Sequence, residues 1–218
     1  MRLFAAIVPP RAVLDELIKV LQSVDAPVEP ATPRRGLFGR RRANGTHAAR
    51  QPEASAAHEG ELDRPTAAEM YLPITHFGNV TLGDSVQLAD ALRADVATWS
   101  RPEVHFSGGA ALEWPGDESV WAKLDGDIDA LMTIGRGVPL VVQRLGFFVD
   151  RRQFRPWLSV GTITAATTAP YLEQLVGALE AFRGQDWTVE SVSLMKRLPK
   201  AEGPVEFEEM ERMPLAAA

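Results

Sequence analysis

The fold prediction starts from two short apolar segments, Leu72-Pro73-Ile74-Thr75-His76-Phe77-Gly78 and Phe154-Arg155-Pro156-Trp157-Leu158-Ser159-Val160. Their length, apolar content and flanking turn residues are typical of strands. Side chains two residues apart on a strand share a face. Pro73 and Thr75 are therefore expected to point the same way, and so are Trp157 and Ser159.

The same alternation makes a prediction for His76. It is expected on the face opposite Thr75, together with Leu72 and Ile74. Only a bulge or a one-residue register slip would bring His76 round to the face of Thr75.

Outward from these segments, strands and helices alternate along the chain. Periodicity predicts strands at 2–8, 71–80, 104–114, 119–124, 156–163, 187–198 and 205–213. It predicts helices at 10–24, 84–99, 127–134 and 169–182, while 138–149 fits either state. The two halves look like variants of one plan. The expected fold is α+β, with two pseudo-symmetric lobes of antiparallel sheet flanking a central cleft and helices outside.

Composition excludes several classes of protein. The 218 residues carry a formal charge of −6, which argues against a protein that coats DNA or RNA. Cysteine is absent, which excludes disulfides, thiolate catalysis and cysteine-based zinc sites. The sequence has neither a signal-peptide layout nor an apolar stretch of about 20 residues. A cytoplasmic monomer with no membrane association is expected.

Residues 29–67 differ from the rest of the chain. Their only large apolar side chains are Leu37, Phe38 and Leu62, too few to offset the entropy of ordering, so this insert is predicted to be disordered. The chain is then a single bilobed domain over 1–218 that is interrupted by an Arg-rich insert. The Arg34–Arg42 arm is either a contact for an acidic partner or a solubilising linker.

The two opening segments resemble the paired motifs of the 2H phosphoesterase superfamily, in its bacterial branch of 2′-5′ RNA ligases and RNA 2′,3′-cyclic phosphodiesterases. Further similarity lies at the first strand, at the exit from the first motif and at the closing hairpin, in residues 2–7, 77–80 and 192–215. The resemblance covers almost the whole chain outside the insert. It implies the bilobed fold described above, an RNA end or nucleotide phosphoester as partner, and no metal or other cofactor.

In that family each motif is His-x-Thr or His-x-Ser. The resemblance implies that one histidine acts as general base, the other as general acid, and that the hydroxyls hold phosphate oxygens. This sequence departs at both histidines, where Pro73 and Trp157 stand, and keeps Thr75 and Ser159. Proline and indole cannot accept a proton. The family reaction is therefore expected to be impaired, as in a pseudoenzyme.

Anion binding does not need the histidines. Arg152 and Arg155, with Arg151 beside them, precede the second hydroxyl, and arginine suits bidentate contact with phosphate. Together with Thr75 and Ser159 they are candidates to clamp a phosphate, and Trp157 is a candidate to stack on a base. The alternatives are an exposed arginine loop and a Trp157 that fills the cleft.

Three functions remain open at this point. The first is a divergent protein that binds a phosphoester or RNA end in the cleft. The second is an active phosphodiesterase (a hydrolase) that uses a displaced group such as His76 or His105. The third is a non-enzymatic interaction protein that acts through its basic arm.

Overall fold

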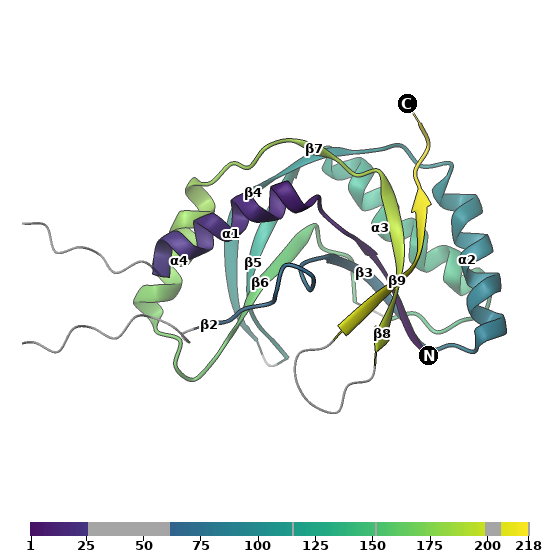
Figure 1. Cartoon of the computed structure of the whole chain (residues 1–218), viewed down its shortest axis with the longest axis horizontal. Helices are drawn as coiled ribbons and strands as arrows, with labels where there is room; N and C mark the ends of the chain where they lie inside the picture. The colour runs from purple at the N-terminus through teal and green to yellow at the C-terminus, as the bar shows by residue number, and fades with distance from the viewer. Residues whose placement is uncertain (26–61, 115, 151, 199–205, 218) are drawn as a thin grey trace, which may run out of the picture.

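Two antiparallel sheets with four helices make up the computed structural model, which describes residues 1–25, 62–114, 116–150, 152–198 and 206–217 (Figure 1). The predicted α+β class and the pair of antiparallel sheets are confirmed. Residues 29–61 of the predicted insert, including the Arg34–Arg42 arm, lie outside the described residues.

The first sheet has the order β3-β1-β8-β9, formed by β3 (Leu72–Asn79), β1 (Arg2–Ile7), β8 (Ser191–Leu198) and β9 (Glu206–Pro214). Strand β1 is buried on both faces from Leu3 onward. Leu3, Ala5 and Ile7 enter the main core, whereas Phe4 and Ala6 join a separate small cluster on the other face. This second face is the one that borders the site described below.

The second sheet has the order β2-β6-β5-β4-β7, formed by β2 (Leu62–Asp63), β6 (Trp157–Ile163), β5 (Asp117–Gly126), β4 (Glu103–Trp114) and β7 (Trp187–Thr188). The prediction of one strand over 187–198 is wrong, because β7 belongs to this sheet and β8 to the first. Between them the Val189 N–H donates to the Pro102 carbonyl at 2.9 Å, so the chain crosses from one sheet to the other there.

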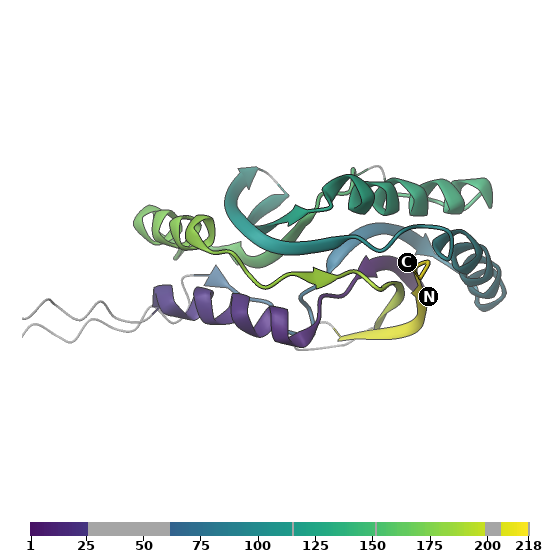
Figure 2. The ribbon, with the colours of Figure 1, turned by 90° about the horizontal axis from the view of Figure 1, so that it is seen from above.

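The helices lie outside the two sheets (Figure 2). They are α1 (Arg11–Asp25), α2 (Leu82–Val96), α3 (Ile128–Arg144) and α4 (Ala169–Ala181). Helix α1 packs on α4, which covers β4, while α2 packs on α3, which contacts β3. None of these helices is long and apolar enough to cross a membrane.

Helix α3 is longer than the predicted 127–134 and takes in the first part of the ambiguous stretch. Its buried residues follow the helical spacing past Pro139, and they are Leu131, Ile134, Gly135, Val138, Val141 and Val142. Burial of this stripe outweighs the cost of a proline inside a helix. Gly135 allows Phe154 to lie against the helix, because a Cβ at this position would be 2.1 Å from the Phe154 ring.

The predicted boundary of the insert at residue 67 is wrong. Leu62 and Asp63 form an edge strand that pairs with β6, and Leu62 is buried. The Arg64 guanidinium donates to the Asp25 carboxylate at 2.8 Å and also to the Tyr171 hydroxyl. A single buried leucine and one shared ion pair thus order a stretch whose composition alone suggested disorder.

Candidate functional site

The two sheets approach each other along β3 and β6, whose Cα atoms come within 8 Å. Among the described residues, two pockets are lined by both sheets at this junction, and a third pocket beside them is lined by the first sheet and Tyr71. The central pocket, of about 580 Å³, is lined by residues that include Pro73, Thr75, His76, Arg152, Arg155 and Trp157. The rim pocket, of about 540 Å³, is lined by residues that include Asp63, Tyr71, Pro73, Trp121, Ser159 and Phe207. The arginine pocket, of about 400 Å³, is lined by residues that include Arg2, Phe4, Tyr71, His76, Arg197 and Phe207.

Shared residues make the three pockets one groove. The central and rim pockets both contact Pro73 and Trp121. The arginine pocket meets the central pocket at His76, and it meets the rim pocket at Tyr71 and Phe207. A ligand longer than one pocket would therefore find a continuous surface.

The first sheet brings His76 to the groove, contrary to the prediction from strict alternation. In the register of β1 and β3, Ala5 pairs with Thr75 but Ala6 pairs with Pro73, so β3 has one extra residue between them. Beyond this bulge His76 pairs with Phe4, on the same face as the pairing of Ala6 with Pro73. Because of the bulge, the side chain of His76 lies on the same face of β3 as that of Pro73.

The bulge affects Thr75 in the opposite sense. Its partner Ala5 belongs to the main core, and the Thr75 side chain is only 4% exposed. It borders the central pocket, but its Oγ1 is buried and has no hydrogen-bond partner among the described residues. The expectation that Pro73 and Thr75 point the same way is wrong, because the bulge places them on opposite faces of β3.

On the second sheet the alternation of β6 is as predicted. Trp157 and Ser159 are partly exposed, and Leu158 and Val160 between and after them are fully buried. On β5, Lys123 is the pairing partner of Trp157, and Trp121 is the pairing partner of Ser159. Trp157 and Ser159 therefore share the face that borders the groove.

Two cations lie over the Trp157 indole. The Lys123 Nζ is 5.6 Å and the Arg155 Cζ is 5.3 Å from the ring centroid. Arg155 also forms an ion pair with Asp117, whose carboxylate oxygen is 3.1 Å from the guanidinium nitrogen. Trp157 is thus a cation-bearing wall of the central pocket rather than an isolated apolar plug.

The segment that carries Arg152 lies against β3. The Asp150 N–H donates to the His76 carbonyl at 3.2 Å, and the Asp150 carboxylate is 3.7 Å from Arg152. This contact explains how a loop from the second half of the chain lines a pocket beside the first sheet. Arg151 lies outside the described residues.

The two hydroxyl residues named from the motifs do not line a common pocket. Thr75 borders the central pocket and Ser159 the rim pocket, with Pro73 and Trp121 common to both. The central pocket therefore brings together, besides Thr75, five of the predicted site residues, Pro73, His76, Arg152, Arg155 and Trp157. Ser159 lines the neighbouring rim pocket instead.

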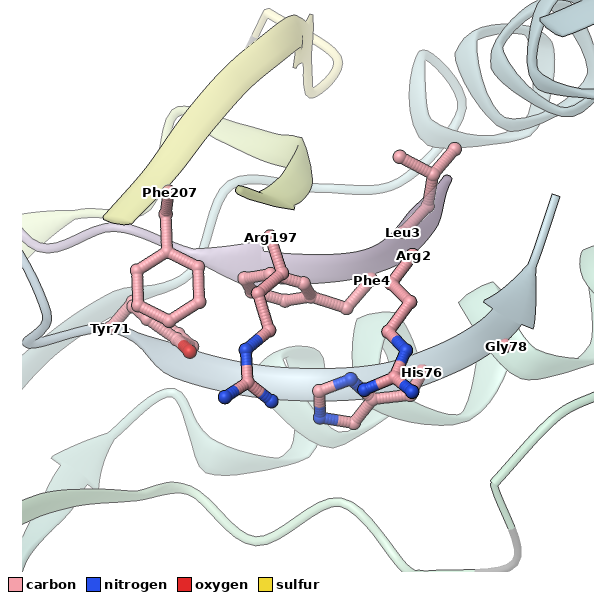
Figure 3. A pocket seen from close by; sticks show the side chains of 8 residues that line it. All are labelled: Arg2, Leu3, Phe4, Tyr71, His76, Gly78, Arg197 and Phe207. Carbon is pink, nitrogen blue, oxygen red and sulfur yellow. The ribbon is translucent and has the colours of Figure 1, made fainter. Parts of the chain in front are cut away.

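The arginine pocket was not predicted from the sequence. Figure 3 shows the guanidinium groups of Arg2 and Arg197 on the same side as the His76 imidazole, beside the rings of Phe4, Tyr71 and Phe207. Burial raises the pKa of Tyr71 to about 12, although the charge of Arg197 opposes this rise. The available signal was weak, since Arg2 and Arg197 occupy the ends of two strands that are far apart in the sequence.

The surroundings of His76 lower its pKa and so favour the neutral form of its imidazole. Burial is the main cause that lowers its pKa from 6.5, the charges of Arg152 and Arg197 lower it further, and Asp150 raises it. Its ring lies 5.3 Å from that of Phe4. A neutral imidazole in a groove is able to accept a proton.

The His76 titration is expected to have a midpoint below 6.5, measured by NMR from its imidazole proton signals. Arg197→Gln removes a repelling charge and should raise the midpoint, whereas Asp150→Asn removes an attracting charge and should lower it further. Because the folded pKa lies below the unfolded value, protonation of His76 disfavours folding as the pH falls through 6.5. A midpoint above 6.5 would contradict this description of the groove.

The other histidine considered, His105, lies away from the groove. Its Nδ1 is 2.9 Å from the Asp186 carboxylate, and the side chain is 12% exposed. In the described part of the chain, no group of three or more histidine or acidic side chains is arranged to hold a metal ion.

No family model and no curated protein matches this sequence. Several solved structures match its fold over nearly the whole chain. TT0787 of Thermus thermophilus is 17% identical with a TM-score of 0.63, covering 99% of this chain and 98% of the other. Escherichia coli LigT complexed with 3′-AMP is 15% identical with a TM-score of 0.66, again covering 99% and 98%.

A third similar structure is described as a phosphoesterase, at 14% identity, with a TM-score of 0.66 and 99% coverage of both chains. E. coli LigT has also been solved with NADP+, with ATP and with phosphate. At these identities the likeness concerns the fold. The bilobed fold implied by the resemblance to 2H phosphoesterases is therefore confirmed.

Proposed function

We propose that this protein binds the phosphate of a nucleotide in the central pocket, and that it does so without the two-histidine chemistry of 2H phosphoesterases. The observation that carries the proposal is the Trp157 indole with Arg155 and Lys123 over it, at 5.3 and 5.6 Å, in a pocket of about 580 Å³. A flat aromatic surface next to cations suits a base linked to a phosphate.

Two arginines of the lining suit the same ligand, and a phosphate would compete there with their carboxylate partners Asp117 and Asp150. Arg152 and Arg155 provide planar guanidinium groups for a phosphate, and the pocket is within the range of volumes typical of small-molecule sites. A pocket of this size is also evidence against a Trp157 that merely fills the cleft. The structures of E. coli LigT with 3′-AMP, ATP and NADP+ supply a parallel, since that protein has the same fold and holds nucleotides.

The loss of catalysis is inferred from two positions. Pro73 and Trp157 stand where the motifs have histidine, and both line the central pocket. Each missing acid or base is worth roughly 10²–10⁴-fold in rate. Binding without efficient in-line displacement is the consequence.

An active cyclic phosphodiesterase is the second candidate, and one observation favours it. The bulge in β3 turns His76 toward the groove, where it lines the central pocket and where burial lowers the pKa of its imidazole. A single base without a facing acid would support at most part of the family's rate. Turnover of a 2′,3′-cyclic nucleotide that is abolished by His76→Ala would favour this candidate over the first.

An interaction protein that acts through the Arg34–Arg42 arm stays a prediction, because the arm lies outside the described residues. The arm and the groove can be separated by mutation. Deletion of residues 34–50 should abolish binding of an acidic partner if the arm is responsible, while leaving nucleotide binding intact.

The proposed function is tested by calorimetric titration with adenosine 3′-monophosphate, followed by incubation with adenosine 2′,3′-cyclic monophosphate. We expect 1:1 binding that inorganic phosphate competes with, and no turnover above that of buffer. Arg155→Gln should weaken binding about 10-fold, through loss of a charge-assisted hydrogen bond. Arg183→Gln is the matched control, because Arg183 pairs with Asp186 on the surface. The absence of nucleotide binding would contradict the proposal.

A further inference from the structure

Arg2 and Arg197 stand directly opposite each other on the neighbouring strands β1 and β8. Like charges directly opposite in a sheet destabilise it. Both side chains border the arginine pocket, and in the described part of the chain neither forms an ion pair with a carboxylate (Figure 3). The sheet therefore tolerates an electrostatic cost at this position.

The opposite face of the same strands is built differently. Lys196, next to Arg197, faces Glu208 on β9, and their charged atoms are 3.0 Å apart. Arg197 itself faces Phe207 on β9. Lys196 thus has a carboxylate partner, whereas no carboxylate among the described residues lines the arginine pocket, which is the pattern expected of a site for an external anion.

The floor of the arginine pocket is aromatic. The rings of Phe4, Tyr71 and Phe207 contact one another, with centroid separations of 5.1 Å for Phe4–Tyr71, 5.5 Å for Phe4–Phe207 and 5.3 Å for Tyr71–Phe207. Such a floor lowers the local dielectric constant and strengthens a hydrogen bond between arginine and phosphate. It also offers a surface on which a base could stack.

The carboxylates near the pocket do not form ion pairs with Arg2 or Arg197 in the described part of the chain. Asp150 raises the pKa of His76 and pairs with Arg152, while Glu69 raises the pKa of Tyr71. The guanidinium groups of Arg2 and Arg197 therefore remain the dominant charges at the pocket.

We propose that Arg2 and Arg197 form a second phosphate subsite, so that the groove takes a ligand with two phosphoryl groups linked through one nucleoside. This inference rests on the proposed function. The first phosphate lies in the central pocket near Arg152 and Arg155, the second in the arginine pocket, and the two pockets adjoin at His76. A free nucleoside 3′,5′-bisphosphate and the 3′-phosphorylated end of an oligonucleotide share this chemistry.

The test compares adenosine 3′-monophosphate with adenosine 3′,5′-bisphosphate by calorimetry at one fixed salt concentration. The bisphosphate should bind at least about 10-fold more tightly, because it adds charge-assisted hydrogen bonds. The double variant Arg2→Gln, Arg197→Gln should lose this advantage while its affinity for the monophosphate stays within about twofold of wild type.

The matched control is the double variant Arg93→Gln, Lys196→Gln, which removes the same charge from groups paired with Glu211 and Glu208. It should keep the advantage. Equal affinity for the two nucleotides, or an advantage that survives the loss of Arg2 and Arg197, would overturn the second subsite alone. Failure of both nucleotides to bind would instead contradict the proposed function.

A third ligand distinguishes the two sources. The 3′-phosphorylated dinucleotide ApAp carries a second base, which can stack on the aromatic floor. Tighter binding of ApAp than of the bisphosphate, lost on Phe207→Ala, would support the subsite and assign the ligand to oligonucleotide ends. Equal or weaker binding of ApAp, with the bisphosphate advantage intact, would support the subsite for a free mononucleotide.

The repulsion between Arg2 and Arg197 can be measured without any ligand, from thermal unfolding. Arg2→Gln should raise the melting temperature by roughly 1–3 °C at low salt, because it removes the repulsion from Arg197. A lower melting temperature would show that the pair is not destabilising and would remove the main support for an anion site.

Discussion

Trp157→Ala is expected to weaken the binding of adenosine 3′-monophosphate roughly 10- to 100-fold, with a melting temperature within about 3 °C of wild type. The indole lies partly exposed on the groove face of β6, where Arg155 and Lys123 pack over it. Its removal takes away a stacking surface worth roughly 1–3 kcal/mol and leaves both cations without their aromatic support. Calorimetry gives the affinity, and thermal unfolding gives the stability.

Trp157→Phe is the control for this change. A phenyl ring preserves most of the stacking surface, so its affinity should fall much less than that of the alanine variant. Tighter binding by the alanine variant would mean that the indole obstructs the pocket, which was the alternative left open by the sequence. That result would contradict the role of Trp157 as a stacking wall.

Leu158→Ala is expected to lower the free energy of unfolding by about 2–5 kcal/mol, which corresponds to roughly 4–20 °C in melting temperature. Leu158 is fully buried in the main core, on the opposite face of β6 from Trp157. Its truncation leaves a cavity in the main core. Thermal or urea unfolding measures the loss.

Neighbouring residues 157 and 158 thus make a matched pair. The variant at 157 should affect binding and spare stability, and the variant at 158 should do the reverse at temperatures where it is folded. Leu158→Met, which roughly conserves volume, should cost less than about 1.5 kcal/mol. A Leu158→Ala protein as stable as wild type would show that β6 presents the other face to the core.

Strand β6 was predictable over residues 157–160 because its alternation is unbroken there; the irregularity in its pairing with β5 lies beyond Ser159, between the pairs Trp121–Ser159 and Val120–Gly161. Leu158 and Val160 alternate with Trp157 and Ser159, so burial of one set fixes the exposure of the other. The class of fold followed for the same reason, since most strands and helices are marked by local periodicity.

For strand β3, the sequence did not predict which side chains lie on which face of the sheet. The sequence contains no sign of the extra residue between the pairs Ala5–Thr75 and Ala6–Pro73, because a bulge is fixed by the partner strand. Its consequence is large for the site. The hydroxyl of Thr75 becomes buried, and His76 turns to the groove.

The prediction that residues 62–67 are disordered failed for a related reason. Arg64 donates to the Asp25 carboxylate, and Leu62 pairs with Ile163 on β6. Neither contact is local in the sequence. Composition describes what a segment can bury by itself, and it says nothing of what distant elements offer.

The sequence by itself determined most of the strand and helix pattern and the absence of cysteine chemistry. These are properties of residue type and short spacing. Only the tertiary structure decided that His76 faces the groove and that Arg2 meets Arg197 across two strands. Register and sheet order set such pairings, because they join segments whose separation along the chain carries no information about their distance in space.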